Sequence, residues 1–340
     1  MNHPQQKLCI IIPAYKGAYL ARALESLVAQ TDQRFRVYVG DDASPEGLEA
    51  IVRVSGLRQD QYVYHRFSEN LGGQSLVQHW HRCIGLSTEP WVWLFSDDDE
   101  LEPGCVSAFH RTLEKTGERV DICRFNTVMI DAFGAVRRIS PPHPREEHWR
   151  EFAYYLLRNL RFCVQQECVF RRRRYEDVNG FLDLPLAWCS DHAFAVAAGT
   201  HQRAITVEGP RVRFRMSGAN ISSVAGPSTS RRKVDASMLY IRWFMAHLSA
   251  HPSRPEGVPG NEMLREAALE WFERSLGGQR ELLTPGRLLV LARFVRDVWG
   301  DSLSIAVLRI LRVYIHAAPE VLTNLGRVVG VRGVRSWKWG

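Results

Sequence analysis

The sequence lacks several features that would each define a class of protein. None of its 340 residues lies in an uninterrupted apolar run of the roughly 18 residues that a membrane-spanning helix needs. The apolar run at residues 8–12 is too short for a secretory signal and is stopped by Pro13, so we expect a cytoplasmic protein. The seven cysteines form no Cys-x-x-Cys pair, which argues against a zinc framework or a disulfide scaffold. Internal repeats are missing too, as is a glycine-rich, lysine-bearing phosphate loop near the N-terminus.

Positive charge is concentrated at one end of the chain. The formal net charge is +7, and residues 285–340 carry nine arginines and lysines against three acids. Residues 303–316 predict a helix that is apolar on most sides, with Arg309, Arg312 and His316 along one stripe. Such a helix suits an anionic membrane surface, but it equally suits a core helix with exposed arginines. Basic and aromatic residues nearby would extend the same surface: Arg327, Arg332, Arg335, Trp337, Lys338 and Trp339.

The segment WVWLFSDDDELEP, at residues 91–103, ends a short apolar run with three consecutive aspartates. The apolar run predicts a buried strand, and ligands of open α/β sheets bind at the carboxyl ends of the strands. Three adjacent carboxylates repel one another unless a cation lies among them. A solvated acidic turn is the alternative if the triplet is considered by itself.

The first hundred residues repeat an order of apolar strand, polar turn and amphipathic helix. The second strand also ends in acids, Asp41 and Asp42. This alternation predicts an α/β fold with a mostly parallel, doubly wound sheet, in which both acidic ends lie on one edge. The expected strands are residues 8–12, 35–39 and 62–65, together with the apolar run that begins at residue 91. The expected helices are residues 20–28 and 75–84.

Six short motifs occur in an order and spacing that resemble the family 2 glycosyltransferases of bacterial polysaccharide and envelope glycan synthesis. They are IIPAYKGA (11–18), GDDASPEG (40–47), ENLGGQS (69–75), FSDDDELEPG (95–104), VNGFLD (178–183) and SDHAF (190–194). The resemblance covers roughly residues 7–222. It implies the GT-A fold, a Rossmann-like sheet of the kind that the strand pattern predicts.

The resemblance implies a set of residues that bind the nucleotide-sugar donor. A carboxylate suits uracil and ribose, which offer a ring N–H and hydroxyl groups. Asp41 and Asp42 could instead cap the following helix, a role that Ser44 could fill equally well. The implied donor-binding residues are Pro13, Ala14, Tyr15, Asp41, Asp42, Asn70, Gly72 and Asp97.

The metal motif of the family is Asp-x-Asp, and this chain departs from it. The Pro-Gly pair at 103–104 resembles the loop that follows the motif in the family. Counted back from this pair, Asp98 and Asp99 match the two aspartates that commonly end the family's motif, and Ser96 stands where the family has its first aspartate. Read directly, Asp97 and Asp99 also form Asp-x-Asp. We therefore expect Asp98 and Asp99 to bind Mn²⁺ or Mg²⁺, and which of the three aspartates touches the ion stays open.

Inversion at the sugar needs a general base for the acceptor hydroxyl, and the resemblance assigns that role to Asp191. Asp191 starts a helix expected within residues 188–199, where it could also simply complement the helix dipole. The acid that often precedes it in the family is replaced by Ser190, and His192 is more often a structural residue than a catalytic one.

Arg213 and Arg215 alternate along a strand expected at residues 212–216, so they lie on one face. Guanidinium groups there could assist the metal in binding a diphosphate. Ordinary surface arginines are the alternative.

The chain divides into a catalytic part, residues 1–225, and a helical, basic C-terminal region, residues 234–340, that could associate with a membrane or a partner. Residues 226–233 (GPSTSRRK) predict a linker, and residues 251–260 predict a break between helices. The loop at residues 140–150, rich in proline, falls where a flap on the acceptor side is expected.

The pattern as a whole predicts an inverting, metal-dependent glycosyltransferase of hexosyltransferase type. The expected donor is a UDP-sugar, and the expected acceptor is a hydroxyl of a glycan or lipid-linked glycan. The protein could lie peripherally on the inner face of the cell membrane, and no nucleic-acid partner is expected. The alternatives are a nucleotidyltransferase of related topology, or a non-catalytic protein that binds nucleic acid or membrane.

Overall fold

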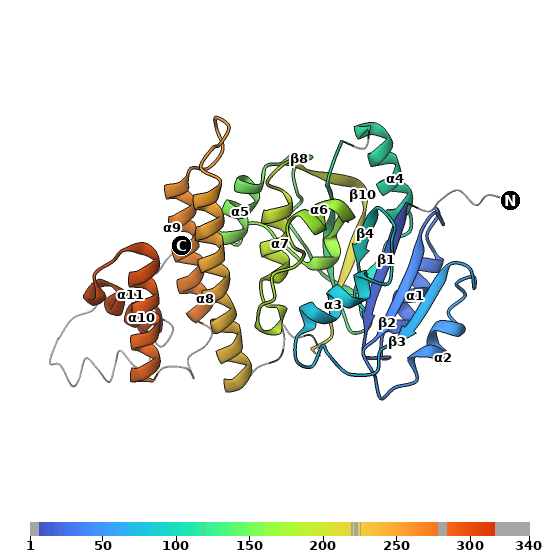
Figure 1. Cartoon of the computed structure of the whole chain (residues 1–340), viewed down its shortest axis with the longest axis horizontal. Helices are drawn as coiled ribbons and strands as arrows, with labels where there is room; N and C mark the ends of the chain where they lie inside the picture. The colour runs from blue at the N-terminus through green and yellow to red at the C-terminus, as the bar shows by residue number, and fades with distance from the viewer. Residues whose placement is uncertain are drawn as a thin grey trace.

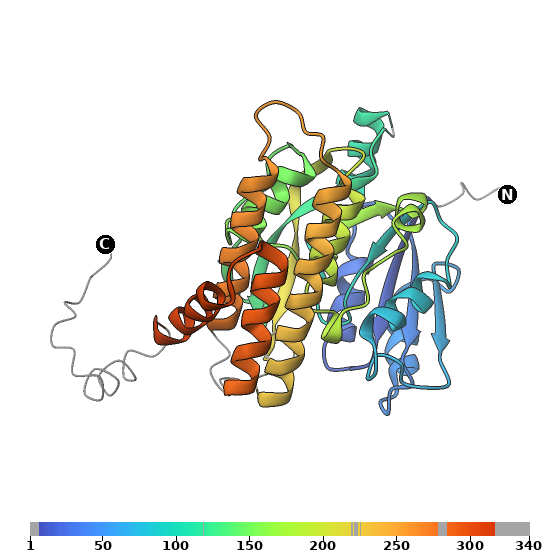
Figure 2. The ribbon, with the colours of Figure 1, turned by 60° about the vertical axis from the view of Figure 1, so that its left-hand side comes forward.

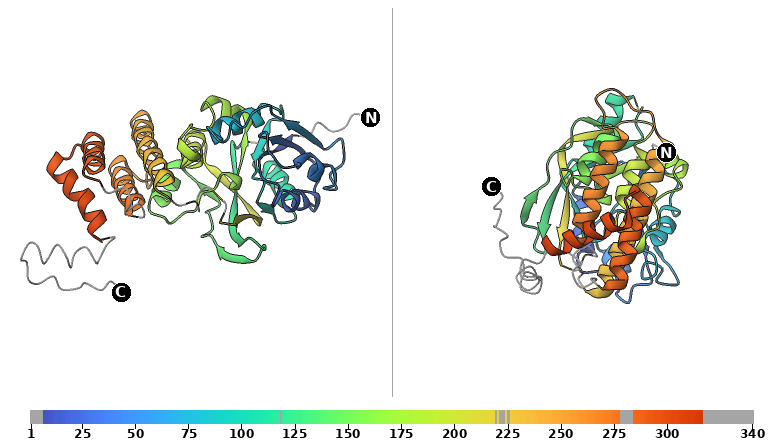
Figure 3. Two further views of the ribbon diagram at one scale, coloured as in Figure 1. Left: turned by 90° about the horizontal axis from the view of Figure 1, so that it is seen from below. Right: turned by 90° about the vertical axis from the view of Figure 1, so that its left-hand side faces the viewer.

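The protein is elongated, with a sheet-based half and a helical half (Figure 1). This computed structural model describes residues 7–117, 119–218, 220, 224, 226–277 and 284–316. The sheet half contains the N-terminal residues, and the C-terminal helices extend it in one direction, as the view from below makes clear (Figure 3).

Four parallel strands form the first half of the sheet, as the sequence pattern predicts. Strand β1 (Leu8–Ala14) pairs with β2 (Arg36–Asp41) on one side and with β4 (Trp91–Leu94) on the other. Strand β3 (Tyr62–Arg66) continues the sheet beyond β2. The intervening helices are α1 (Leu20–Val28), α2 (Leu48–Arg53) and α3 (Leu76–Ile84).

Beyond β4 the sheet becomes mixed, and its strand order is β3-β2-β1-β4-β9-β6-β10-β5. Strand β9 (Cys168–Arg171) is antiparallel to both of its neighbours, β4 and β6 (Ile122–Asp131). Strand β10 (Ala204–Met216) runs parallel to β6 and antiparallel to β5 (Glu100–Leu101). The smaller elements here are α4 (Cys105–Thr116), β7 (Val136–Ile139), β8 (Glu146–Glu147), the 3₁₀ turns η1 (Gln165–Glu167) and η2 (Pro185–Ala187), and α6 (Arg172–Asp177).

Both faces of the central strands are buried, which explains their nearly continuous apolar sequence. In β1, Leu8, Ile10 and Ile12 pack into one hydrophobic cluster, and Cys9 and Ile11 pack into another on the opposite face. Side chains of a strand alternate between faces, so each face of the sheet has its own core. Such a core fixes the register of the strands, and with it the position of the loops that follow them.

The C-terminal helices share one hydrophobic core with part of the sheet-based half. The helices are α8 (Pro227–Ala250), α9 (Asn261–Gly277), α10 (Pro285–Trp299) and α11 (Leu303–His316). Helices α8, α9 and α10 stand side by side, and α11 lies at an angle to them (Figure 2). Their buried side chains form one cluster with those of α5 (Trp149–Leu157) and α7 (Ser190–Ala198). The helical region predicted from the sequence is confirmed as far as residue 316.

The prediction that residues 226–233 form a linker is wrong, because α8 begins at Pro227. Proline suits the first position of a helix, where its missing N–H would have no partner. Gly226 precedes it at φ 130°, a conformation that residues with a side chain rarely adopt. The polar composition of this segment therefore marks the start of a helix. The break at residues 251–260 is confirmed.

Helix α11 packs by one face and exposes another. Ala306 and Ile310 are fully buried in the shared core, whereas Ile305 and Leu308 are 48% and 66% exposed. Arg309 forms ion pairs with Asp301 and Glu273. Helix α11 therefore packs on the neighbouring C-terminal helices, and its contact with a membrane surface stays a prediction. Among the described residues, no helix combines the length and apolar character needed to cross a bilayer. The side chain of His316 and the basic and aromatic residues at 327–339 lie outside the described part.

Acid should weaken this packing through His247 of α8. Its ring lies 5.1 Å from that of Trp149 and 4.2 Å from that of His251. Burial, together with the charge of His251, lowers the pKa of His247 to about 4. The unfolded chain takes up a proton more readily, so the stability that this histidine contributes is lost as pH falls from about 6.5 towards 4.

We expect His247→Gln to reduce the loss of unfolding free energy between pH 7 and pH 5 by about 1 kcal/mol. Urea denaturation at the two pH values measures this change in unfolding free energy. Substitution of the exposed His201 by Gln is the matched control. An identical loss in the two variants would contradict the expectation.

Candidate active site

The carboxyl ends of β1, β2 and β4 meet at one edge of the sheet. In the parallel register Ala14 lies opposite Asp41, and the backbone N–H of Asp42 donates to the carbonyl of Ala14 at 2.9 Å. Phe95, which follows β4, donates its backbone N–H to the carbonyl of Ile11 at 2.8 Å. The two acidic loops that the sequence predicts to be neighbours therefore flank the end of β1.

Asp41 is fully buried and holds the loop after β2. Its carboxylate accepts hydrogen bonds from the backbone N–H of Ser44 at 2.7 Å and from Arg66 Nη1 at 2.7 Å. It also accepts from the hydroxyl of Tyr64, whose pKa is raised to about 12 by burial and by this hydrogen bond. Asp41 does not cap the following helix, because the N-cap of α2 is Gly47 and has no side-chain cap.

Asp42 holds the glycine turn at residues 70–73. Its two oxygens accept the backbone N–H groups of Leu71 and Gly72, each at 2.9 Å, and Arg82 forms an ion pair with it. A Cβ atom at position 72 would lie 2.5 Å from Asp42 Oδ2, so the turn needs glycine there. The structure thus brings together three of the predicted donor-binding residues, Asp42, Asn70 and Gly72.

Asn70 closes the same turn from within. Its Oδ1 accepts the backbone N–H of Gly73 at 2.6 Å. The turn is consequently fixed at both ends, by its own asparagine and by the loop after β2.

Asp97 connects the acidic triplet to the loop after β1. Its Oδ2 accepts the backbone N–H groups of Tyr15 and Lys16, at 3.0 and 3.1 Å. The carbonyl of Tyr15 in turn accepts a hydrogen bond from Ser44 Oγ at 2.6 Å, which ties in the loop after β2. The predicted residues Pro13, Ala14, Tyr15 and Asp97 therefore belong to one continuous rim.

Asp98 and Asp99 differ in how their oxygens are used. Asp99 is fully buried, and its oxygens accept hydrogen bonds from the backbone N–H of Arg215 at 2.7 Å and from Gln166 Nε2. Asp98 is partly exposed and accepts a hydrogen bond on one oxygen, from Asn220 Nδ2 at 2.9 Å. Within the described residues Asp98 is therefore the better placed of the two to bind a ligand, whereas Asp99 supports the loop.

The acidic triplet raises the pKa of its own members. Burial and the charge of Asp97 raise the pKa of Asp98 to about 7. Burial and the charge of Asp98 raise the pKa of Asp99 well above its usual range. A divalent cation would relieve this repulsion, and carboxylate oxygens are the ligands that Mg²⁺ and Mn²⁺ prefer. The donor set of Asp97 and Asp98 thus fits such an ion.

Arg213 and Arg215 lie on one face of β10, as predicted, and both contact Glu100. Arg215 is 1% exposed and donates to the carbonyls of Asp98 and Asp131, at 2.7 and 2.9 Å. Arg213 also donates to the carbonyl of Gly134 at 2.7 Å. In this structure the two arginines brace the acidic loop, and their predicted contact with a diphosphate stays a prediction.

Asp191 lies in the first turn of α7, as the sequence predicts, and its side chain is 21% exposed. It is not the N-cap, which is Cys189 with no side-chain cap. Its Oδ1 accepts the backbone N–H of His192 at 2.9 Å. Burial raises the pKa of Asp191 against the lowering effect of His192. A carboxylate with a raised pKa is a better proton acceptor at neutral pH, as a general base requires.

One short segment, residues 163–167, reaches both the acidic loop and the surroundings of Asp191. Gln166 donates to Ser96 Oγ and to Asp99, and its carbonyl accepts from Trp93 Nε1 at 2.8 Å. Three residues earlier, Cys163 lies close to Asp191. The predicted base and the predicted metal loop are therefore on either side of this segment.

Two residues that support the site were not among the predicted ones. Asn220 begins an Asn-Ile-Ser run (220–222) at the end of the part of the chain that resembles the family, residues 7–222, so a signal was present in the sequence. Gln166 has no local sequence signal, because its role depends on β9 entering the sheet beside β4.

The mixed sheet with an acidic rim at the ends of its parallel strands defines a glycosyltransferase of the GT-A fold. The model of the family described as glycosyl transferase family 2 matches residues 9–178, half of the chain, and the protein belongs to this family. A search of curated proteins finds no match.

Solved structures of TarS from S. aureus have the same fold. The complex of TarS residues 1–349 with UDP-GlcNAc is 15% identical, with a TM-score of 0.66, over 94% of this chain and 92% of that one. The same fragment without ligand gives 14% identity and a TM-score of 0.63 over the same shares. The complex of this fragment with UDP gives 14% identity and a TM-score of 0.52, again over 94% of this chain and 92% of that one.

Alanine substitutions at positions 98 and 99 should distinguish metal binding by Asp98 from support of the loop by Asp99. We expect Asp99→Ala to lower the unfolding free energy of the metal-free protein by about 1–3 kcal/mol, because two buried donors lose their acceptor. Asp98→Ala should lower it less, because its partly exposed carboxylate accepts a single hydrogen bond, but it should abolish stabilisation by Mn²⁺. Urea denaturation and thermal shift with and without Mn²⁺ measure both effects. Equal losses of stability would contradict the assignment.

Proposed function

We propose that this glycosyltransferase moves a sugar from a UDP-sugar to a hydroxyl of a glycan acceptor, with inversion and with the help of Mn²⁺ or Mg²⁺. The observation that carries the proposal is the placement of Asp191 and of the acidic loop on either side of residues 163–167. The fold shared with TarS, whose complexes contain UDP-GlcNAc and UDP, supports a UDP-sugar donor and makes UDP-GlcNAc the first to test.

The nucleotide end of the donor would lie along the ends of β1 and β2. Asp41 and Asp42 fix the loop after β2 and the turn at residues 70–73. In the proposal Pro13, Ala14 and Tyr15 contact the base, and the buried acidic pair keeps in place the loops that receive the ribose.

The diphosphate would lie beside the acidic loop. Asp98, with Asp97 beside it, would hold the cation, and Asp99 would keep the loop in place through Arg215 and Gln166. The bound ion would neutralise the charge that grows on the leaving diphosphate. Glu100 and the two arginines of β10 maintain the position of Asp98 by holding its backbone.

Asp191 would accept the proton of the attacking hydroxyl. The reaction forms a bond between the acceptor oxygen and the anomeric carbon and breaks the bond from that carbon to the diphosphate oxygen. Proton removal by a positioned carboxylate makes the acceptor oxygen more nucleophilic as it attacks. The buried position of Asp191 raises its pKa towards the range where this transfer is efficient.

Family membership disfavours a nucleotidyltransferase and a nucleic-acid-binding protein, and a non-catalytic relative is the remaining alternative. The replacement of the first motif aspartate by Ser96 is the feature that favours it. An assay for turnover of a UDP-sugar with Mn²⁺ distinguishes an active glycosyltransferase from a non-catalytic relative. Binding of UDP without turnover would favour the non-catalytic protein.

Asp191→Asn should lower kcat by about 10²–10⁴-fold, because the amide accepts no proton from the acceptor. The affinity for UDP with Mn²⁺, measured by calorimetry, should stay within a few-fold of wild type. Exposed Glu176→Gln is the matched control, with kcat expected near the wild-type value. Unchanged turnover in Asp191→Asn would remove the base assignment.

The acceptor in this proposal is a lipid-linked or envelope polysaccharide intermediate at the inner face of the cell membrane. The exposed apolar side chains Ile305 and Leu308 on α11 support it, together with the positive charge of residues 285–340. Apolar area and electrostatic attraction to anionic lipids add in binding of this kind.

Flotation with anionic vesicles tests the membrane contact. We expect the full-length protein to float, and recovery to fall several-fold with Ile305→Asp plus Leu308→Asp or with neutral vesicles. Leu239→Asp, at an exposed apolar position on α8, is the matched control. Equal recovery of all proteins with both kinds of vesicle would contradict the proposal.

A further inference from the structure

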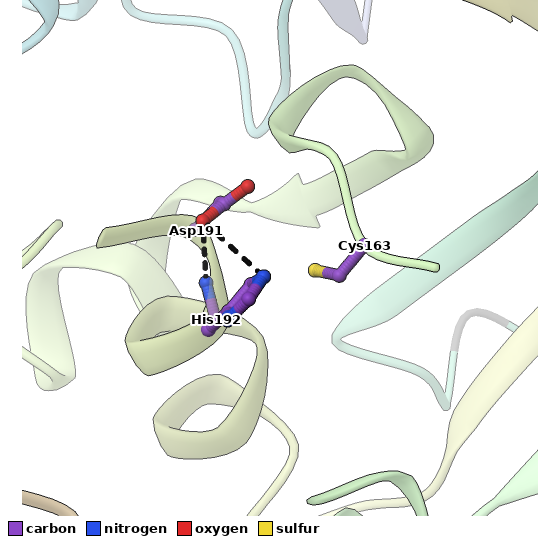
Figure 4. Close-up of side chains that lie close together, drawn as sticks. All are labelled: Cys163, Asp191 and His192. Atoms are coloured by element: carbon purple, nitrogen blue, oxygen red, sulfur yellow. Dashed lines mark hydrogen bonds and ion pairs between the residues drawn. The ribbon is translucent and has the colours of Figure 1, made fainter. Parts of the chain in front are cut away.

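Three side chains of different chemistry converge beside α7: Cys163, Asp191 and His192 (Figure 4). The thiol sulfur, a carboxylate oxygen and a ring nitrogen all lie within 4.8 Å of one another. His192 Nε2 lies 4.0 Å from Asp191 Oδ1. In Figure 4 this nitrogen lies between the carboxylate and the sulfur. Each side chain thus directs one potential metal ligand to a common point.

Hydrogen bonds occupy these ligand atoms only in part: Asp191 Oδ1 accepts the backbone N–H of His192 and keeps a further lone pair. Cys163 is buried, and no described residue forms a hydrogen bond with its sulfur. His192 and Asp191 are about one-fifth exposed at the side chain, which provides a path for an ion from solvent. His192 Nδ1 is buried and has no hydrogen-bond partner among the described residues.

A sulfur, a nitrogen and an oxygen ligand together favour zinc over the cations expected at the acidic loop. Mg²⁺ and Mn²⁺ prefer oxygen ligands, whereas Zn²⁺ binds cysteine, histidine and aspartate in tetrahedral sites. With zinc–ligand bonds of about 2.0–2.3 Å, tetrahedral ligand atoms lie about 3.3–3.6 Å apart. Coordination therefore requires the three atoms, now within 4.8 Å of one another, to approach by about 1 Å. Three protein ligands leave the fourth position to water.

The buried thiol must lose its proton when it coordinates. Burial raises the pKa of Cys163 well above its usual range, so without an ion the thiol stays neutral and inert. A bound dication reverses this preference and releases the proton to solvent.

The geometry points to a zinc site formed by Cys163, Asp191 and His192 that switches the transferase off by occupying its general base. The inhibitory effect rests on the proposed function, since it requires Asp191 to be the base. A coordinated carboxylate oxygen cannot accept the acceptor's proton. This site is separate from the acidic loop, so Zn²⁺ should inhibit even when Mn²⁺ is saturating.

Cobalt absorption tests the site without any need for turnover. Co²⁺ added to the full-length protein should give a thiolate-to-cobalt charge-transfer band and the visible bands of tetrahedral cobalt. Cys163→Ser should lose the charge-transfer band, and Cys105→Ser, which removes a buried thiol of α4 instead, should keep it. The absence of the band in wild type, or its persistence in Cys163→Ser, would overturn the site.

Competition with a chromophoric chelator then measures zinc affinity. Both Cys163→Ser and His192→Gln should bind Zn²⁺ at least about tenfold more weakly than wild type. Two variants at different elements guard against a folding defect in either one, and far-UV circular dichroism checks each. Wild-type affinity in both would overturn the ligand assignment.

Zinc inhibition of sugar transfer tests the regulatory half of the inference. With saturating Mn²⁺, the zinc concentration for half inhibition should rise at least about tenfold in Cys163→Ser, each protein being compared with its own zinc-free rate. Indifference of the wild-type rate to zinc would overturn the regulation. A protein that shows the cobalt band but no transferase activity would contradict the proposed function and leave the metal site supported.

Discussion

The site depends on how three adjacent carboxylates share one loop. Each aspartate after β4 faces a different partner: Asp97 the backbone after β1, Asp98 the side chain of Asn220, and Asp99 the backbone of Arg215. Hydrogen-bond donors stabilise the charged forms and offset part of the repulsion and of the burial cost. The repulsion and burial cost that these donors do not offset raise the pKa of all three aspartates. The loop is thus held by several partners, while the protein compensates its negative charge only in part.

Local patterns were sufficient to predict the parallel half of the sheet and its acidic edge. An apolar run with both faces buried, followed by acids, predicts a strand and a loop at a known edge, and β1, β2 and β4 follow that rule. The position of Asp191 in the first turn of α7 was predictable for the same reason, since a motif and a helix start coincide there.

The different roles of Asp98 and Asp99 could not be predicted from the sequence, because they depend on partners that are distant along the chain. Arg215 and Gln166 reach Asp99 from more than 60 residues away, and no periodicity encodes such a contact. The start of α8 was misjudged for another reason. A Ser- and Arg-rich composition predicts a linker, but Pro227 after Gly226 begins a helix whose stability comes from packing on α5, α7 and α9.

Residues 163–167 are a short segment through which two distant parts of the chain come together. Gln166 contacts the acidic loop after β4, and Cys163 lies close to Asp191 in the first turn of α7. A change in the length of this segment would therefore disturb both places at once. Insertions and deletions, which surface loops usually tolerate, should be disfavoured at this point of the chain.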